Sequence, residues 1–120
     1  MAQKLKLDGA TNVDLDDFFE GIDYSIAIQL EDSSGSLTDF TGCTFKAEFK
    51  EDIDGATADI AFSSSDIVVS GTTVTWTITK VKTASKGGRT YFYEVEYIDT
   101  LTLTHQLMYG KVPIKNKVVI

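Results

Sequence analysis

Side chains that commonly carry out catalysis are sparse in this sequence. The chain contains one histidine, His105, and one cysteine, Cys43, so neither a histidine-based metal cluster nor an adjacent cysteine–histidine pair is present in the sequence. His105 lies in a threonine- and leucine-rich segment, which favours a structural role. Cys43 has no second cysteine to pair with inside the chain, and we expect a structural thiol. Because no nucleophile, base and orienting group can be assembled, we predict that the protein is not an enzyme.

Three polar motifs have both a chemical and a structural interpretation. Asp52-Ile53-Asp54-Gly55 resembles the start of a calcium loop but lacks the later oxygen ligands and the closing glutamate, which favours a solvated turn. Glu94 and Glu96 share one strand face and could hold a cation or act as acid and base, although exposed sheet polarity explains them more simply. Gly87-Gly88 lacks the context of a phosphate-binding loop and predicts a turn. We therefore predict no catalytic site, no metal and no cofactor.

Three tyrosines form the first candidate binding surface. Tyr91, Tyr93 and Tyr97 project to the same side of a predicted strand, because strand side chains repeat every two residues. Flat aromatic rings match the faces of sugars, so an exposed set of this kind could be a sugar-binding platform. Core packing and cross-strand pairing are the favoured interpretation of the same residues.

Two apolar clusters form the second candidate surface. Phe18 and Phe19 lie beside acidic residues, and Leu107, Met108 and Tyr109 are consecutive in a predicted strand. Consecutive apolar residues in a strand place apolar side chains on both of its sides. We expect one side of each cluster to contact another subunit.

Composition places the chain among single, self-sufficient domains. It has 120 residues, 42% of them hydrophobic, which is enough to bury a core without disulfides or metals. The formal net charge of −7 would repel a phosphate backbone, so we predict no nucleic-acid partner. No long apolar run follows the first lysines, and we expect neither a signal peptide nor a membrane span. The sequence therefore predicts a soluble protein made in a cytoplasm.

Runs of β-branched and aromatic residues, separated by Gly, Asp and Ser, predict an all-β fold. The segment 21–49 is predicted to form edge sheet, with a chain reversal at Asp32–Ser36. Other predicted connections are a tight turn at Gly71-Thr72 and a crossing between sheets over 80–88. The expected strands cover 3–7, 13–19 (short or irregular), 23–31, 44–50, 58–62, 67–70, 73–79, 90–98 and 101–109, the last continuing over 110–117.

Trp76 is the predicted core anchor, because Val74, Trp76 and Ile78 alternate with threonines. Pro113 lacks a backbone donor and marks a sheet edge or a bend. The number and spacing of strands predict an immunoglobulin-like two-sheet β-sandwich of about seven or eight strands, without the antibody disulfide. We assign residues 1–12 to an N-terminal arm or short strand and residues 13–120 to the sandwich.

The order of several segments carries a resemblance to a known family. The segments are 21–24 (GIDY), 30–35 (LEDSSG), 37–44 (LTDFTGCT), 74–79 (VTWTIT), 91–95 (YFYEV) and 110–114 (GKVPI). Together they resemble small immunoglobulin-like modules of tailed bacteriophages, similar to the N-terminal domain of baseplate upper proteins and to related tail accessory proteins. The resemblance spans roughly Val13 to Val118 and implies a structural role, docking to a central hub and to neighbouring copies. The sequence ends at Ile120 and does not include the fibre or receptor-binding region of longer members, so we do not carry the expectation of host recognition over to it.

The sequence thus predicts a virion structural protein, a docking or assembly module of the tail or baseplate. Capsid decoration or head–tail joining is one alternative, because fold alone does not choose among sites on a particle. A carbohydrate-binding module is the other. The expected partners are other virion proteins and further copies of the chain, with no membrane and no small-molecule substrate. We expect synthesis in the host cytoplasm and a final location in the virion.

Overall fold

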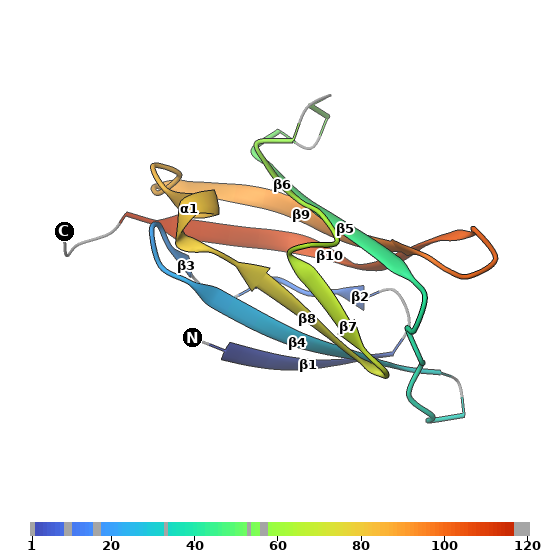
Figure 1. Cartoon of the computed structure of the whole chain (residues 1–120). Helices are drawn as coiled ribbons and strands as arrows, with labels where there is room; N and C mark the ends of the chain where they lie inside the picture. The colour runs from blue at the N-terminus through green and yellow to red at the C-terminus, as the bar shows by residue number, and fades with distance from the viewer. Residues whose placement is uncertain are drawn as a thin grey trace.

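The computed structural model describes residues 2–8, 11–15, 18–32, 34–52, 54–55 and 58–116. Within these ranges the chain is almost entirely β-structure, with one short helix, and it forms two stacked sheets (Figure 1). The elements are β1 (Ala2–Asp8), β2 (Thr11–Asn12), β3 (Phe18–Phe19), β4 (Tyr24–Glu31), β5 (Thr44–Lys50), β6 (Ile60–Phe62), β7 (Ile67–Ser70), β8 (Thr73–Ile78), α1 (Lys80–Thr83), β9 (Arg89–Ile98) and β10 (Thr104–Lys115). The predicted all-β sandwich is therefore confirmed.

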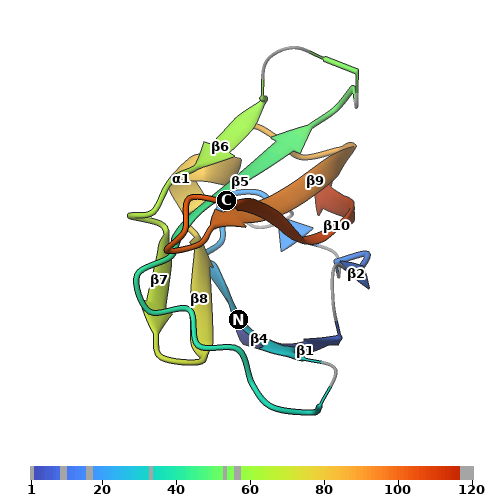
Figure 2. The same cartoon turned by 90° about the vertical axis from the view of Figure 1, so that its right-hand side faces the viewer.

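The strand order is that of an immunoglobulin domain. One sheet has the order β1-β4-β8-β7, and the other has the order β2-β10-β9-β5-β6, with β3 also paired to β10. The two layers face each other in the perpendicular view (Figure 2). Strands β4, β8 and β7 correspond to B, E and D of an immunoglobulin sandwich, and β10, β9, β5 and β6 correspond to G, F, C and C′. The N-terminal β1 departs from a purely antiparallel pattern, because it runs parallel to β4.

The segment 21–49 does not form edge sheet, which corrects the prediction. Strand β4 lies between β1 and β8, and β5 lies between β6 and β9 in the other sheet. The reversal at Asp32 is present, since its carboxylate accepts hydrogen bonds from the amides of Ser34 (2.9 Å) and Ser36 (3.0 Å). After that turn the chain crosses between layers instead of pairing β4 with β5. Local turn chemistry was predictable, whereas the sheet that the next strand joins was not.

The core fills the space between the sheets with aromatic side chains. Trp76 is fully buried, as predicted, and its ring centroid lies 5.2 Å from Phe62, 5.7 Å from Phe49 and 6.0 Å from Tyr93. The Nε1 atom of Trp76 is buried and has no hydrogen-bond partner among the residues that the structure describes. This cluster joins β5, β6, β8 and β9, and so holds the two sheets together.

Two connections behave as the sequence predicts. Ser70 pairs with Thr73 across the β7–β8 turn, where Gly71 has a φ of +59°, a conformation that glycine adopts without steric cost. Residues 79–88 carry the chain from one sheet to the other and include α1, which the sequence did not predict. The buried Thr83 hydroxyl accepts a hydrogen bond from Gly21 at 3.0 Å, which fixes this crossing to the start of β4.

The N-terminal segment after β1 lies along β10. The amide of Val13 donates to the carbonyl of Tyr109, and that of Leu15 donates to Lys111, both at 2.8 Å. Donors and acceptors alternate along a strand, so the nitrogen of Pro113 faces the same edge as Lys111. Pro113 thus lies between the residues of β10 that pair with β2 and those that pair with β3, so β10 is not an edge strand in the sheet order.

Candidate docking site

Three of the five predicted interface residues belong to the core. Phe18, Leu107 and Met108 are 0%, 1% and 0% exposed, so they are not available to a partner of the folded chain. Phe18 stacks on Tyr24 with ring centroids 4.4 Å apart. The prediction of an interface is wrong for these three residues.

A β-bulge explains the buried pair. The register between β9 and β10 shifts between Gln106 and Met108, so Leu107 is an extra residue in the strand. A bulge breaks the alternation of side chains and lets two consecutive residues face the same side. Leu107 and Met108 consequently both enter the core, although the sequence pattern indicated opposite faces.

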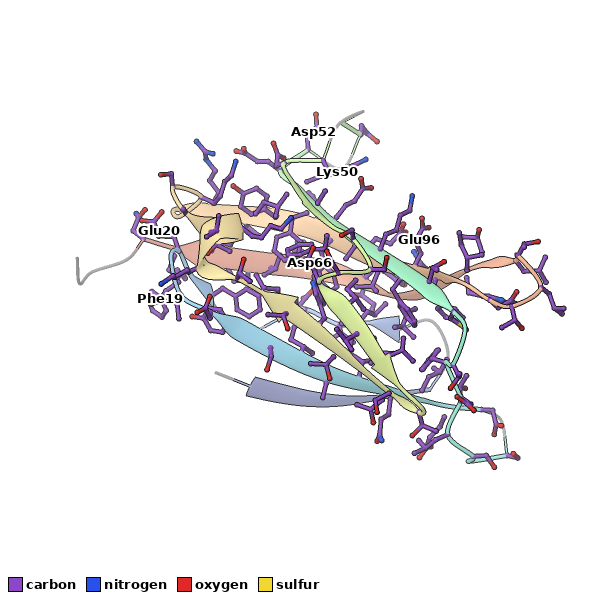
Figure 3. The ribbon with its side chains drawn as sticks, viewed as in Figure 1. Phe19, Glu20, Lys50, Asp52, Asp66 and Glu96 are labelled. Carbon is purple, nitrogen blue, oxygen red and sulfur yellow. The ribbon has the colours of Figure 1, made fainter. Side chains whose placement is uncertain are left out.

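The other two predicted residues are exposed but lie apart. Phe19 is 42% exposed and Tyr109 is 38% exposed. Phe19 pairs with Lys115 on β10, six residues along the strand from Tyr109, which is about 20 Å. Phe19 lies at the end of the sandwich where α1 is found (Figure 3). The two residues do not form one patch, and a contact at either remains a prediction.

The tyrosine platform is not exposed, which corrects the sugar-binding prediction at these residues. Tyr91 and Tyr93 are 0% and 3% exposed and pack in the core. Tyr97 is half-buried, with its ring stacked on Phe45 and on His105. Burial raises the pKa of Tyr93, and its hydroxyl donates to the carbonyl of Val13. The three rings therefore stabilise the sandwich and offer no flat surface for a sugar.

The outer face of β5, β9 and β10 carries a grid of charged side chains. Lys46 lies opposite Glu96, and their side chains form an ion pair of 3.1 Å. The Glu96 carboxylate raises the pKa of Lys46, first through its hydrogen bond and then through its charge. Gln106 donates instead to Glu94, at 2.5 Å. Glu94 and Glu96 thus have different partners and do not converge as an acid–base pair.

This face is hollowed on one side. A concavity of about 500 Å³ is bordered by the following residues: Asn12, Asp14, Glu48, Lys50, Phe92, Tyr93, Glu94, Gln106, Tyr109, Gly110 and Lys111. Lys50 and Glu96 point away from the opposite sheet in Figure 3. Lys111 places its ammonium 5.9 Å from the centre of the Phe92 ring. Charged side chains are prominent in the border of the concavity, and its one phenylalanine, Phe92, is half-buried and lies under the Lys111 ammonium.

The β9–β10 connection has a different character. We define the hairpin tip as residues 98–104, which extend beyond the neighbouring strands at one end of the sandwich (Figure 1). Its three aliphatic side chains are exposed: Ile98 by 41%, Leu101 by 76% and Leu103 by 56%. Apolar side chains gathered on a protruding turn are typical of a contact surface. The hairpin tip is the candidate docking site.

Asp99 organises the backbone of the hairpin tip. Its carboxylate accepts hydrogen bonds from the amides of Leu101 (2.8 Å) and Leu103 (3.0 Å), and His105 Nε2 lies 2.7 Å from its second oxygen. Main-chain bonds from Asp99 to Leu103 and from Thr102 to Asp99 close the turn. The hydrogen bond with His105, followed by those from the backbone, lowers the pKa of Asp99. The carboxylate is therefore ionised and fully engaged at neutral pH.

Sequence reasoning missed this site. Leucines and threonines alternate over 100–104, and this two-residue period predicted a strand beginning at Leu101. Strand β10 instead begins at Thr104, and Thr102 has a φ of +63°, which interrupts an extended chain. The sequence feature that could have indicated the hairpin tip was Asp99, a residue type that favours the first position of a turn, followed closely by two leucines.

The remaining candidate motifs lie at turns or against the core. The carboxylate of Asp52 accepts from the amide of Asp54 at 3.0 Å, which makes a turn; residue 53 lies outside the described residues. Gly88 lies at a bend, and its amide donates to the carbonyl of Ile114 on β10 at 2.7 Å. Cys43 packs against the core, and burial raises the pKa of its thiol. In the described part of the chain, no three His, Cys, Asp or Glu residues converge on a possible metal site, and no helix could span a membrane.

Among known proteins, the comparisons give similarity of general shape only. No protein-family model and no curated protein matches the chain. Among solved structures, the fold is similar to the N-terminal domain of phage TP901-1 ORF48, with a TM-score of 0.48 and 10% sequence identity. That alignment covers 96% of this chain and 99% of the other. At this distance the similarity assigns no function, which has to be argued from the residues themselves.

Proposed function

We propose that the protein is a structural docking module of a bacteriophage tail or baseplate. The observation that carries the proposal is the hairpin tip, where Ile98, Leu101 and Leu103 are exposed on a hydrogen-bonded turn. The resemblance of the ordered segments to phage immunoglobulin-like modules supports placing this contact in a virion. The sandwich acts as a rigid support, and the tip acts as the contact element.

Docking by a small apolar element suits a repeated assembly. Burial of a leucine side chain contributes about 1.5–3 kcal/mol, so a tip with three aliphatic residues gives a modest contact by itself. Copies held on one ring or lattice raise the effective concentration of each contact and convert modest affinity into stable attachment. We therefore propose that the protein acts in several copies, each attached through its own tip.

Immunogold electron microscopy on purified particles tests the proposal. Antibody to the protein, applied to particles from its source lysate, should place gold at the tail or its tip. Gold over the head would indicate the alternative role in capsid decoration, and gold at the neck would indicate head–tail joining. Absence of the protein from purified particles, measured by mass spectrometry on the same sample, would refute a virion role.

A further inference from the structure

We infer that the outer edge of β7 is a second interaction surface, and that it pairs antiparallel with β7 of another copy of this chain. Such a pairing joins two four-stranded sheets into one continuous sheet across a twofold axis. This surface is distinct from the hairpin tip, and the inference does not depend on the proposed function.

Two residues of β7 direct their main-chain groups away from the sheet. β7 ends the order β1-β4-β8-β7, and no described residue pairs with its outer side (Figure 2). The amide of Thr77 donates to the carbonyl of Asp66 at 2.8 Å, so the main chain of Asp66 faces β8. Hydrogen-bonding directions alternate along a strand, which turns Val68 toward β8 and turns Ile67 and Val69 outward. The outer edge of β7 therefore offers two amide donors and two carbonyl acceptors.

The other sheet edges of the described structure are covered or charged, whereas the β7 edge is neither. β10 is flanked by β2 and β3, and Lys82 donates to the carbonyl of Ala61 on β6 at 2.7 Å. β1 has two lysines and an aspartate among its seven residues. Residues 67–79, which form β7, its turn and β8, include no charged residue and no proline. Charges, prolines and covering segments protect an edge against pairing, so the β7 edge remains open to another strand.

The β7 edge is complementary to itself. With a twofold axis through Val68, Ile67 of one copy lies opposite Val69 of the other, and each such pair exchanges two main-chain hydrogen bonds. All the outward donors and acceptors of both strands are then used. On the outer face of the sheet, Val68, which is 58% exposed, meets Val68 of the second copy. Asp66 lies opposite Ser70 in the same register, and the hydroxyl of Ser70 can donate to its carboxylate.

Charge and symmetry favour a second copy as the occupant. Like charges directly opposite each other destabilise cross-strand pairing, and the twofold register brings none together. The net charge of −7 opposes close approach of two copies, and the uncharged segment 67–79 is where that repulsion is weakest. A twofold contact uses the same surface on both copies and closes at two, so it does not grow into a fibre. Because β7 has only four residues, we expect a weak dimer that is populated at high protein concentration.

Disulfide trapping tests the pairing in the purified protein. Val68→Cys places two thiols opposite each other in a non-hydrogen-bonded pair, where the Cα atoms are about 4.5 Å apart and a disulfide can form. Val81→Cys on α1 is the control, because Val81 is more exposed, at 77%, and is not part of the β7 edge. Both variants carry Cys43→Ala, so that the natural thiol does not contribute. Under mild oxidation we expect roughly tenfold more disulfide-linked dimer at position 68 than at position 81.

Hydrogen exchange gives a readout that needs no substitution. At low protein concentration the amides of Ile67 and Val69 should exchange rapidly, whereas the amide of Val68 is protected by its bond to β8. Raising the concentration should protect Ile67 and Val69, because the second copy then accepts from them.

Substitutions at Val68 separate pairing from folding. Val68→Lys should weaken the dimer roughly tenfold or more in sedimentation equilibrium, because it sets two ammonium groups opposite each other and removes the contact between valines. Val68→Thr is the matched control, since it keeps a β-branched, uncharged side chain, and it should retain most of the dimer. Val68 is exposed, so we expect both variants to unfold at the same temperature as the unmodified protein.

Each outcome either supports or overturns the pairing. Equal crosslinking at positions 68 and 81 overturns it, as do amides of Ile67 and Val69 that stay unprotected at high concentration. Concentration-dependent protection without excess disulfide at position 68 also overturns it, because the twofold axis would not lie at Val68. All these measurements use the purified chain, so a negative result leaves the virion role standing. Absence of the protein from particles, in turn, leaves the β7 pairing standing.

Discussion

Gly110→Ala is expected to detach the N-terminal segment from β10. A Cβ atom at Gly110 would lie 2.3 Å from the carbonyl oxygen of Val13 and 2.7 Å from its carbonyl carbon. Both atoms are backbone, so a side-chain rotation cannot relieve the clash. The segment must move away, and the hydrogen bonds that tie it to β10 must lengthen or break.

The expected loss in free energy of unfolding follows from the hydrogen bonds between this segment and β10. The hydrogen bonds that hold the segment include those from Val13 to Tyr109 (2.8 Å), from Leu15 to Lys111 (2.8 Å) and from Lys111 to the Asp14 carboxylate (3.0 Å). Each contributes about 1 kcal/mol, and a buried Tyr93 hydroxyl left without the Val13 carbonyl costs about 1–3 kcal/mol more. We expect the free energy of unfolding to fall by about 4–6 kcal/mol.

Gly35→Ala is the matched control for backbone strain. Gly35 has a φ of +85°, and a Cβ there would meet no atom within 4 Å. Its substitution should cost only the left-handed penalty of about 1–2 kcal/mol. Urea denaturation measures both values, and hydrogen exchange should show lost protection at Val13 and Leu15 in Gly110→Ala alone. Equal destabilisation by the two variants would refute the close approach as the cause.

Three further predictions concern the core and the pH dependence of stability. Trp76→Ala should lower the free energy of unfolding by about 3–5 kcal/mol in urea denaturation, because Trp76 joins both sheets, and a loss under 1 kcal/mol would contradict this. Folding lowers the pKa of Asp99 below 3.8, so the ionised carboxylate stabilises the folded state above pH 3.8, and this stabilisation is lost as pH falls below that value. Asp99→Asn should therefore weaken the dependence of Tm on acid pH. Burial raises the pKa of Tyr93 above 10, so its neutral hydroxyl stabilises the folded state below pH 10, and this stabilisation is lost as pH rises above that value. Tyr93→Phe should weaken the dependence of Tm on alkaline pH. If Tm falls with rising pH as steeply as in the unmodified protein, Tyr93 is not the group responsible.

Local pattern in the sequence determined the strands and several turns. The two-residue alternation of β4, β5, β8 and β9 was readable because a strand side chain's direction depends only on its position in the chain. Turns at Asp32 and Gly71 were readable for a similar reason, since side-chain capping and positive φ are local properties. Trp76 was identified as a core residue from the threonines that alternate with it.

Tertiary structure decided everything that depends on which strands become neighbours. The sequence did not place β4 and β5 in different sheets, because a short turn and a crossing between layers use the same residue types. The bulge at Leu107 exists only relative to the register of β9, and it turned a predicted interface into core. The exposure of Leu101 and Leu103 arose in the same way, because no strand in the described part of the chain lies over the hairpin tip to bury them. Periodicity reports which side chains share a face, whereas packing decides whether that face is covered.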